Sequence, residues 1–323
     1  MVTIRAWIHS ARLNFIGWGV IGALGVLGLG LWHLAQRAAP AGIEVPGGDG
    51  GGLPRADAET EGFDAAALQD VVGYVRRSGV QALLVTRHAH LLVEHYGTGL
   101  DEHSAIDTGS FAELLVALAA GIALHEHALP LPQDLRLVHA MAADRLARQI
   151  ATASQLSYPQ YLSRNIWQPL NAARAHFLLS SPAATLNAGC CLAARSSDWL
   201  RVAELLIANG RFEGTQVLPT GWAQRVLRPS AEDPGRAFGV WLAASAHGAE
   251  PFVAHDVFFL RGVGRTHLYV APRLAIAILL LDTRAASGGD DETRLPNMVF
   301  RALRAGRAED RQKIDELVPG HSH

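Results

Sequence analysis

The chain has 323 residues, of which 49% are hydrophobic and 18% are charged, and its formal net charge is −2. This composition is typical of a globular protein, and the length allows one large domain or two small ones. Proteins that follow the phosphates of nucleic acid carry a clear positive excess, so the charge balance excludes that class and we expect no nucleic-acid partner.

The first part of the chain contains an uncharged run from residue 15 to residue 35. At a rise of about 1.5 Å per residue, a helix of this length can cross a hydrocarbon core of about 30 Å. Trp18 and Trp32 lie near its two ends, where their rings favour the headgroup level of a membrane. We therefore predict that residues 1–37 form an N-terminal membrane anchor, a single transmembrane helix.

The charges around this run predict an orientation. Arg5 and Arg12 precede it and Arg37 follows it, a weak positive-inside bias that places the main domain in the periplasm. The expected location is thus the inner membrane, crossed once. The alternative is a cleaved signal peptide, because residues 39–41 are Ala-Pro-Ala, although the apolar run exceeds the usual length of about 7–15 residues.

Glycines recur every three residues within the run, at positions 19, 22, 25 and 28. Small residues at this spacing can form a helix–helix contact face, so we expect self-association or a membrane-protein partner. The other explanation is that membrane spans tolerate glycine in general.

Three further segments complete the expected domain organisation. Residues 38–62 are rich in glycine, proline and acidic residues without periodicity, so we predict a flexible linker. Residues 63–304 carry the periodic apolar patterns of a folded domain, and residues 305–323 are a polar tail.

The folded domain begins with a helix, which Asp64 can cap and Gly79 ends, followed by a hairpin of two apolar runs at 82–86 and 91–96. Later helices are expected at 110–124, 138–153, 158–167, 197–209, 219–228 and 295–304, and strands at 239–242, 257–260, 267–270 and 275–281. This order predicts an α+β fold in which the first and last strands share one antiparallel sheet.

A short turn, Asp107-Thr108-Gly109, delivers Ser110 to the start of an apolar run that continues to Leu124. A serine at the mouth of a buried helix is held rigidly and is exposed at one end, which suits a nucleophile. Ser110 is therefore the candidate catalytic residue.

The serine turn and several other short segments resemble the serine β-lactamase and penicillin-binding-protein family, in particular its class C-related esterase and 6-aminohexanoate-dimer-hydrolase branch. These segments lie at 93–97, 158–162, 166–170, 189–195, 198–199, 209–211 and 217–222. The resemblance covers residues 63–304 discontinuously. It implies a β-lactamase/transpeptidase-like fold, in which a helical lobe is inserted into an antiparallel sheet.

The resemblance also implies a catalytic arrangement from which this chain departs. In the family a lysine one helical turn after the serine takes its proton, whereas this chain has Glu113 there. A Tyr-x-Asn element should fall near residues 137–140, which contain no tyrosine; His139 is a base in principle, or else a surface residue. The only lysine, Lys313, lies in the tail. The segment before Tyr158 is short for the family, so we expect a shortened helical lobe and an open site.

Near the end of the domain, Gly262 and Gly264 resemble the Gly-x-Gly strand edge of the same branch. Glycines at such an edge let a substrate approach the backbone, and Arg261 and Arg265 are candidates to bind its carboxylate. The other explanation of the two glycines is a bend in the chain.

We expect no cofactor and no metal site. The sequence lacks a His-x-x-x-His pattern with a helical glutamate, and it lacks the Gly-x-Ser-x-Gly elbow of an α/β-hydrolase. Cys190 and Cys191 are adjacent, and neighbouring cysteines pair only through a strained ring. We therefore predict two small buried side chains without a redox role.

These features together predict a membrane-tethered, β-lactamase-like pseudoenzyme. It would act as a scaffold or bind a peptide, a cell-wall-like ligand or a membrane partner. The alternative is an atypical serine hydrolase that transfers acyl groups from esters, amides or β-lactams to Ser110, with Glu113 or a histidine as its base.

Overall fold

The computed structural model describes residues 42–126, 143–230, 233–285 and 290–304. Gly42–His323 belong to one structural unit and Met1–Ala41 to another. The predicted membrane anchor and polar tail therefore lie outside the described residues. Among the helices of the described part, none combines the length and the hydrophobicity that a bilayer crossing requires.

The described unit alternates between helices and short strands. Its helices are α2 (Ala65–Ser78), α3 (Ala112–His125), α5 (Ala143–Ser154), α6 (Tyr158–Leu162), α7 (Ser196–Ile207), α8 (Trp222–Val226) and α9 (Arg294–Arg301). Its strands are β1 (Gly42–Val45), β2 (Ala82–Arg87), β3 (His90–Tyr96), β4 (Ala105–Asp107), β5 (Ala175–Leu178), β6 (Leu192–Arg195), β7 (Arg211–Phe212), β8 (Thr215–Gln216), β9 (Arg236–Ala237), β10 (Val240–Leu242), β11 (Phe258–Arg261), β12 (His267–Ala271) and β13 (Ile276–Leu281). Short 3-10 turns are η1 (Gly109–Phe111), η3 (Ala243–Ser245) and η4 (Pro272–Leu274), and η2 (Ser163–Trp167) is a π-helical turn.

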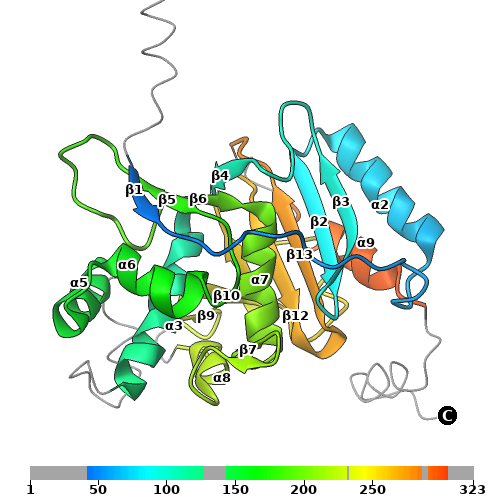
Figure 1. The fold of residues 1–323 in the computed structure, drawn as a ribbon. Helices are drawn as coiled ribbons and strands as arrows, with labels where there is room; N and C mark the ends of the chain where they lie inside the picture. The colour runs from blue at the N-terminus through cyan, green and yellow to red at the C-terminus, as the bar shows by residue number, and fades with distance from the viewer. Residues whose placement is uncertain (1–41, 127–142, 231–232, 286–289, 305–323) are drawn as a thin grey trace, which may run out of the picture. The chain divides into compact units, whose positions relative to one another are not determined.

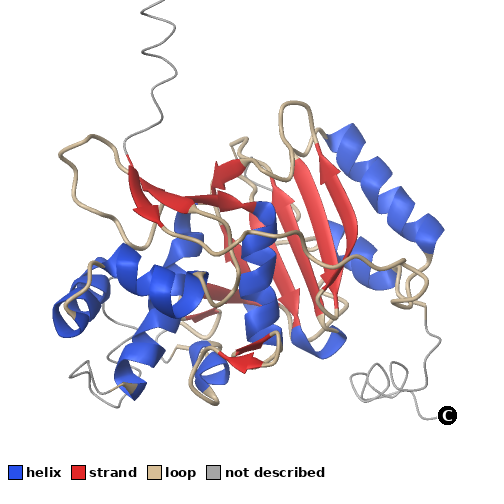
Figure 2. Ribbon diagram, in the orientation of Figure 1, coloured by secondary structure: helices blue, strands red, loops and turns tan. Residues whose placement is uncertain are grey.

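The largest sheet has seven strands in the order β3-β2-β13-β12-β11-β10-β9, and Figure 2 shows its strands in red between two groups of helices. Along β2 and β13 the register runs antiparallel from Arg87 opposite Ile276 to Ala82 opposite Leu281. The first and last of the predicted strands, β2 and β13, therefore share one antiparallel sheet, which confirms the α+β prediction.

Both faces of this sheet are buried. Along β2, Leu84 faces the core that contains α3 and α7, whereas Leu83 and Val85 face the core that contains α2 and α9. This alternation follows from the two-residue period of a strand. In Figure 1, α2 and α9 lie on one side of β2 and β13, and α7 lies on the other.

The expected first helix is confirmed in detail. The side chain of Asp64 accepts a hydrogen bond of 3.0 Å from the backbone N–H of Ala67, and Gly79 ends the helix with φ at +66°. Only glycine adopts that φ readily, so both ends of α2 are encoded locally. The helix predicted at 138–153 is described from Ala143 onward, and its earlier part lies outside the described residues.

A second, four-stranded sheet in the order β1-β5-β6-β4 was missed by the sequence analysis. Its strands are three or four residues long, too short for a periodic pattern to predict them. This sheet positions the serine turn, because β4 ends at Asp107 and pairs there with β6 at Ala193.

The predicted flexible linker is wrong for residues 42–62. Gly42–Val45 form β1, which pairs with β5. The next segment, residues 46–56, which we term the strap, runs from β1 to the β2–β3 hairpin, as the blue trace in Figure 1 shows. At its far end Leu91 donates a backbone hydrogen bond of 2.7 Å to Pro54.

Some of the glycines in the strap lie close against other parts of the chain. A Cβ at Gly47 would lie 2.4 Å from the carbonyl oxygen of Ala172, and one at Gly50 would lie 2.8 Å from the Cβ of Ala173. Arg201 donates to the carbonyl of Gly51. At Gly47 and Gly50, glycine therefore reflects close packing rather than flexibility.

We predict that Gly47→Ala destabilises the fold by about 1–3 kcal/mol, because the added methyl group overlaps the backbone of Ala172. Gly52→Ala is the matched control, since a Cβ at Gly52 meets nothing within 4 Å. Its effect should stay within about 0.5 kcal/mol. Urea unfolding of both variants measures the difference, and equal stabilities would contradict the packing of the strap.

Glu204 on α7 is a buried carboxyl group that faces the β2–β3 hairpin. The hydroxyl of Thr86 donates to it at 2.6 Å, and its residue exposure is 5%. Burial raises the pKa of Glu204 to about 7, although hydrogen bonds from Thr86 and from the backbone of Ala89 oppose the shift. The folded state therefore holds a proton on Glu204 more tightly than the unfolded state does.

Because this pKa is higher in the folded protein, the contribution of Glu204 to the free energy of unfolding is fully present below about pH 4.5 and is lost as the pH rises to about 7. Between these pH values the free energy of unfolding of the wild-type chain should fall by about 3 kcal/mol relative to that of Glu204→Gln, whose side chain cannot ionise. Chemical unfolding between pH 5 and pH 8 measures it. Asp70→Asn, an exposed substitution on α2, should keep the wild-type pH slope. If Glu204→Gln showed the same dependence of stability on pH as the wild-type chain, Glu204 would be excluded as the source of that dependence.

Candidate active site

Ser110 lies in η1, directly before the buried helix α3, and its side chain is exposed. Its hydroxyl donates a hydrogen bond of 2.6 Å to the backbone carbonyl of Arg261 at the end of β11. Every residue of α3 from Leu114 to Ala123 is buried. The turn thus presents the serine at one end of a rigid, buried helix, as the sequence predicted.

The serine turn is held from two sides. The backbone N–H of Gly109 donates to the Asp107 carboxylate at 2.8 Å, and its carbonyl accepts from the N–H of Cys191 at 2.9 Å. Gly109 has a φ of +66°, and a Cβ there would lie 2.9 Å from the Val263 side chain. Glycine is therefore required at this position by conformation and by space.

Glu113, one helical turn after Ser110, forms an ion pair with Arg236 of β9 at 3.9 Å. Both side chains are partly exposed, at 34% for Glu113 and 40% for Arg236. The Arg236 guanidinium also lies over the ring of Trp241, 4.4 Å from its centroid. The carboxylate one turn after Ser110 is therefore paired with a guanidinium from a distant strand.

Tyrosines of the described residues have hydrogen-bond partners or burial away from the hydroxyl of Ser110. Tyr161 donates to Glu126 at 3.0 Å and Tyr96 donates to Glu94 at 3.1 Å. Tyr158 and Tyr269 are buried, and burial raises the pKa of both phenols. Within the described ranges the hydroxyl of Ser110 bonds to a backbone carbonyl and to no side-chain base. Residues 137–140, where the sequence analysis sought the Tyr-x-Asn element and His139, lie outside those ranges.

The two glycines predicted to bind substrate serve the packing of the chain. A Cβ at Gly262 would lie 2.5 Å from the carbonyl oxygen of Thr108, so this glycine lets the end of β11 press against the serine turn. Gly264 has a φ of +63° and lies close to the backbone of Asp282 and Arg284. It therefore serves the tight turn between β11 and β12.

The two arginines predicted to bind a carboxylate are already paired within the protein. Arg265 forms ion pairs with Asp282 and, at 3.8 Å, with Asp290. The Arg261 side chain donates to both oxygens of Glu292, at 2.7 and 2.8 Å. Of these two residues, the structure brings only the backbone carbonyl of Arg261 to Ser110.

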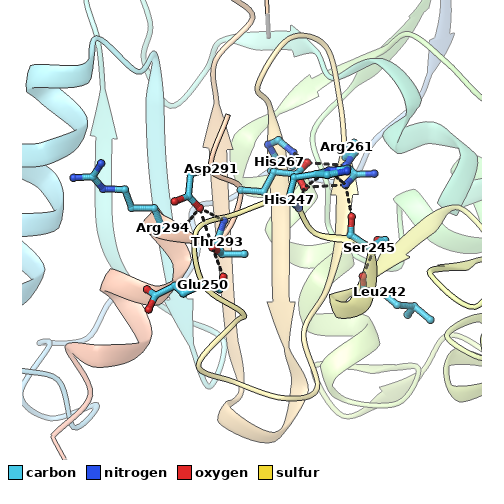
Figure 3. A network of polar contacts seen from close by, with 10 residues as sticks. Leu242, Ser245, His247, Glu250, Arg261, His267, Asp291, Thr293 and Arg294 are labelled. Carbon is cyan, nitrogen blue, oxygen red and sulfur yellow. Dashed lines mark hydrogen bonds and ion pairs between the residues drawn. The ribbon is translucent and has the colours of Figure 1, made fainter. Parts of the chain in front are cut away.

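Arg261 belongs to a polar network in which it converges with His247 and His267, as Figure 3 shows. Glu292 lies at its centre, with a side-chain exposure of 9%. Burial alone would raise the pKa of Glu292. Hydrogen bonds from His267, Arg261 and the backbone N–H of His247 outweigh burial and hold that pKa far below its ordinary value.

His267 contacts two oxygen atoms of this network through its ring nitrogens. Its Nδ1 lies 2.9 Å from the backbone carbonyl of Arg265, and its Nε2 lies 3.1 Å from a carboxylate oxygen of Glu292. The network therefore ties β11, through Arg261, and β12, through His267, to the carboxylate of Glu292, and the last carbonyl of β11 contacts Ser110.

The prediction for the cysteines is wrong, because Cys190 and Cys191 form a disulfide bond with each other. Both side chains are partly exposed rather than buried. Sequence reasoning also missed Arg236, which comes from a distant strand with no local signal. The role of Asp107 was recognisable, since an Asp two residues before a Gly commonly closes a turn through its side chain. Within the described ranges no cluster of side chains has a metal-binding arrangement.

Comparison with known proteins finds similarity at the level of structure. No model of a known protein family matches the sequence, and no curated protein matches it.

Three solved structures illustrate the similarity. A protein from Bacillus anthracis named as a candidate 6-aminohexanoate-dimer hydrolase has 15% identity and a TM-score of 0.62, covering 87% of this chain and 92% of its own. A β-lactamase from Mycobacterium bovis has 17% identity and a TM-score of 0.56, covering 73% and 99%. A penicillin-binding-protein homologue from Caulobacter crescentus has 11% identity and a TM-score of 0.56, covering 74% and 97%.

These similarities extend over nearly the whole of each compared protein, and the topology agrees with the α+β arrangement expected from the sequence. The chain therefore has the fold of the serine β-lactamases and penicillin-binding proteins.

Proposed function

We propose that this protein is a β-lactamase-like domain that has lost acyl transfer and acts by binding, as a scaffold or as a receptor for a peptide or cell-wall-like ligand. The observation that carries the proposal is the surroundings of Ser110. The hydroxyl of Ser110 donates its hydrogen bond to the Arg261 carbonyl. The side chain one helical turn later is Glu113, which forms an ion pair with Arg236. A backbone carbonyl does not act as a general base at neutral pH, so among the described residues no hydrogen-bonded base activates the hydroxyl.

The ligand class is proposed from the fold. A compared structure is described as a penicillin-binding-protein homologue, and this description supports a cell-wall-like or peptide ligand as the class to test. The second candidate function is an atypical serine hydrolase. The exposure of Ser110 at the start of α3 favours it, since a buried serine could not be reached by a substrate.

We expect no covalent adduct when the full chain is incubated with a fluorophosphonate or a penicillin and examined by intact-mass spectrometry. Loss of the general base alone should slow acylation by about 10²–10⁴-fold. The double variant Glu113→Lys/Arg236→Gln supplies an amine one turn after Ser110 and removes the cation that would repel it. It should gain an adduct.

Ser110→Ala in both backgrounds is the control, and circular dichroism verifies that each variant is folded. An adduct on the wild-type chain that disappears in Ser110→Ala would overturn the proposal and establish the hydrolase. An adduct that persists in Ser110→Ala would arise from another residue and would not bear on Ser110.

We further propose that residues 1–37 anchor the domain in the inner membrane, with the described unit in the periplasm. The uncharged run at 15–35 and the arginines before it support this proposal. The glycines within the run support self-association or pairing with a membrane-protein partner.

Membrane fractionation tests the anchor. The full chain should stay in the membrane pellet after alkaline carbonate extraction, whereas a chain lacking residues 1–37 should be released, because about twenty apolar residues have been removed. Edman sequencing or mass spectrometry of the mature N-terminus distinguishes an anchor from a cleaved signal peptide. Recovery of the full-length chain in the soluble fraction would contradict the proposal.

A further inference from the structure

We propose that the Cys190–Cys191 disulfide is a redox-active site that accepts electrons from a dithiol donor, and that its oxidation state controls the backbone of the serine turn. This inference concerns a chemical modification of the protein and does not depend on whether Ser110 is active. It rests on the position of the disulfide, its accessibility and its contacts.

The disulfide lies directly between the smaller sheet and the serine turn. The N–H of Cys191 donates to the carbonyl of Gly109 at 2.9 Å. The carbonyl of Cys191 accepts from the N–H of Leu178 on β5, also at 2.9 Å. The Gly109 carbonyl belongs to the peptide bond that joins Gly109 to Ser110. The orientation of that peptide is therefore set by a hydrogen bond from one of the two bonded cysteines.

A disulfide between neighbours cannot act as an ordinary cross-link. A disulfide stabilises a fold mainly by closing a loop in the unfolded chain, and the effect grows with the length of that loop. The sequence separation here is 1, so almost no loop is closed. What the bond constrains is the local backbone, since the ring that it closes includes the peptide bond between Cys190 and Cys191.

The backbone at Cys191 depends on that constraint. Its φ is +65°, in the left-handed region that residues with a Cβ rarely adopt. The closed ring limits the conformations available to both cysteines. Once the ring is opened, Cys191 is free to leave this region, and the hydrogen bond from its N–H to Gly109 weakens.

The disulfide is also within reach of a reductant, because both cysteine side chains are partly exposed. A thiolate of the dithiol attacks one cysteine sulfur, which breaks the S–S bond and releases the other cysteine as a thiolate that takes a proton from solvent. The second thiol of the donor then attacks the mixed disulfide. The donor leaves oxidised to a cyclic disulfide, and the protein holds two reduced thiols, a transfer of two electrons.

The experiment uses the full chain in two oxidation states, prepared with and without dithiothreitol. Iodoacetamide labelling in denaturant, followed by mass spectrometry, counts free thiols. We expect none before reduction and two after reduction of the folded protein. Hydrogen exchange then measures the backbone, and the amide of Cys191 and the amides of residues 107–112 should exchange about tenfold faster in the reduced chain.

The variant Cys190→Ser/Cys191→Ser is the matched control. It should exchange like the reduced chain and should not respond to dithiothreitol. Amides of β2 and β13, in the centre of the large sheet, should be unchanged in all samples. Alkylation without a reductant, a bond that resists dithiothreitol in the folded protein, unchanged exchange at the turn, or faster exchange throughout the molecule would each overturn the inference. None of these outcomes depends on acylation or on a ligand.

Discussion

The contact between the serine turn and the end of β11 is the constraint on which the candidate site depends. It joins a helix start to a strand that lies far away in sequence, and it leaves no room for side chains, since a Cβ at Gly262 would overlap the carbonyl of Thr108. Because the two backbones touch, the Ser110 hydroxyl reaches the carbonyl of Arg261. The buried pairing of Arg261 with Glu292 holds the strand in place from the opposite face of the sheet.

Much of this architecture could be predicted from the sequence, because it is encoded locally. Asp64 and Gly79 mark the ends of α2, and the apolar runs around the turn at Arg87–His90 predict the hairpin. The position of Ser110 at the start of a buried helix was also recognisable. Each of these features depends on residues within a few positions of one another, where periodicity and capping chemistry are informative.

The features that the sequence did not predict depend on contacts between distant segments. The glycine content of the strap is typical of a linker, yet the absence of a Cβ at Gly47 allows the strap to lie against the backbone of Ala172. Likewise, the sequence pattern at Gly262 predicts a binding motif, whereas in the structure this glycine allows close packing. Arg261 was a candidate to bind the carboxylate of a ligand, but its side chain is paired with Glu292. Composition states which residues are present, but the partner of each residue is decided by tertiary structure.

The charge arrangement around Ser110 is the last consequence of these distant contacts. The resemblance to the family places a cation on the serine helix, whereas this chain places a carboxylate there, Glu113, and supplies the cation, Arg236, from an edge strand. The pair is locally neutral, and the guanidinium is further held by the face of Trp241. A guanidinium does not give up its proton at neutral pH, so Arg236 cannot replace a lysine as the base. The site therefore combines an exposed serine with a pair of opposite charges whose two members come from segments that lie far apart in the sequence.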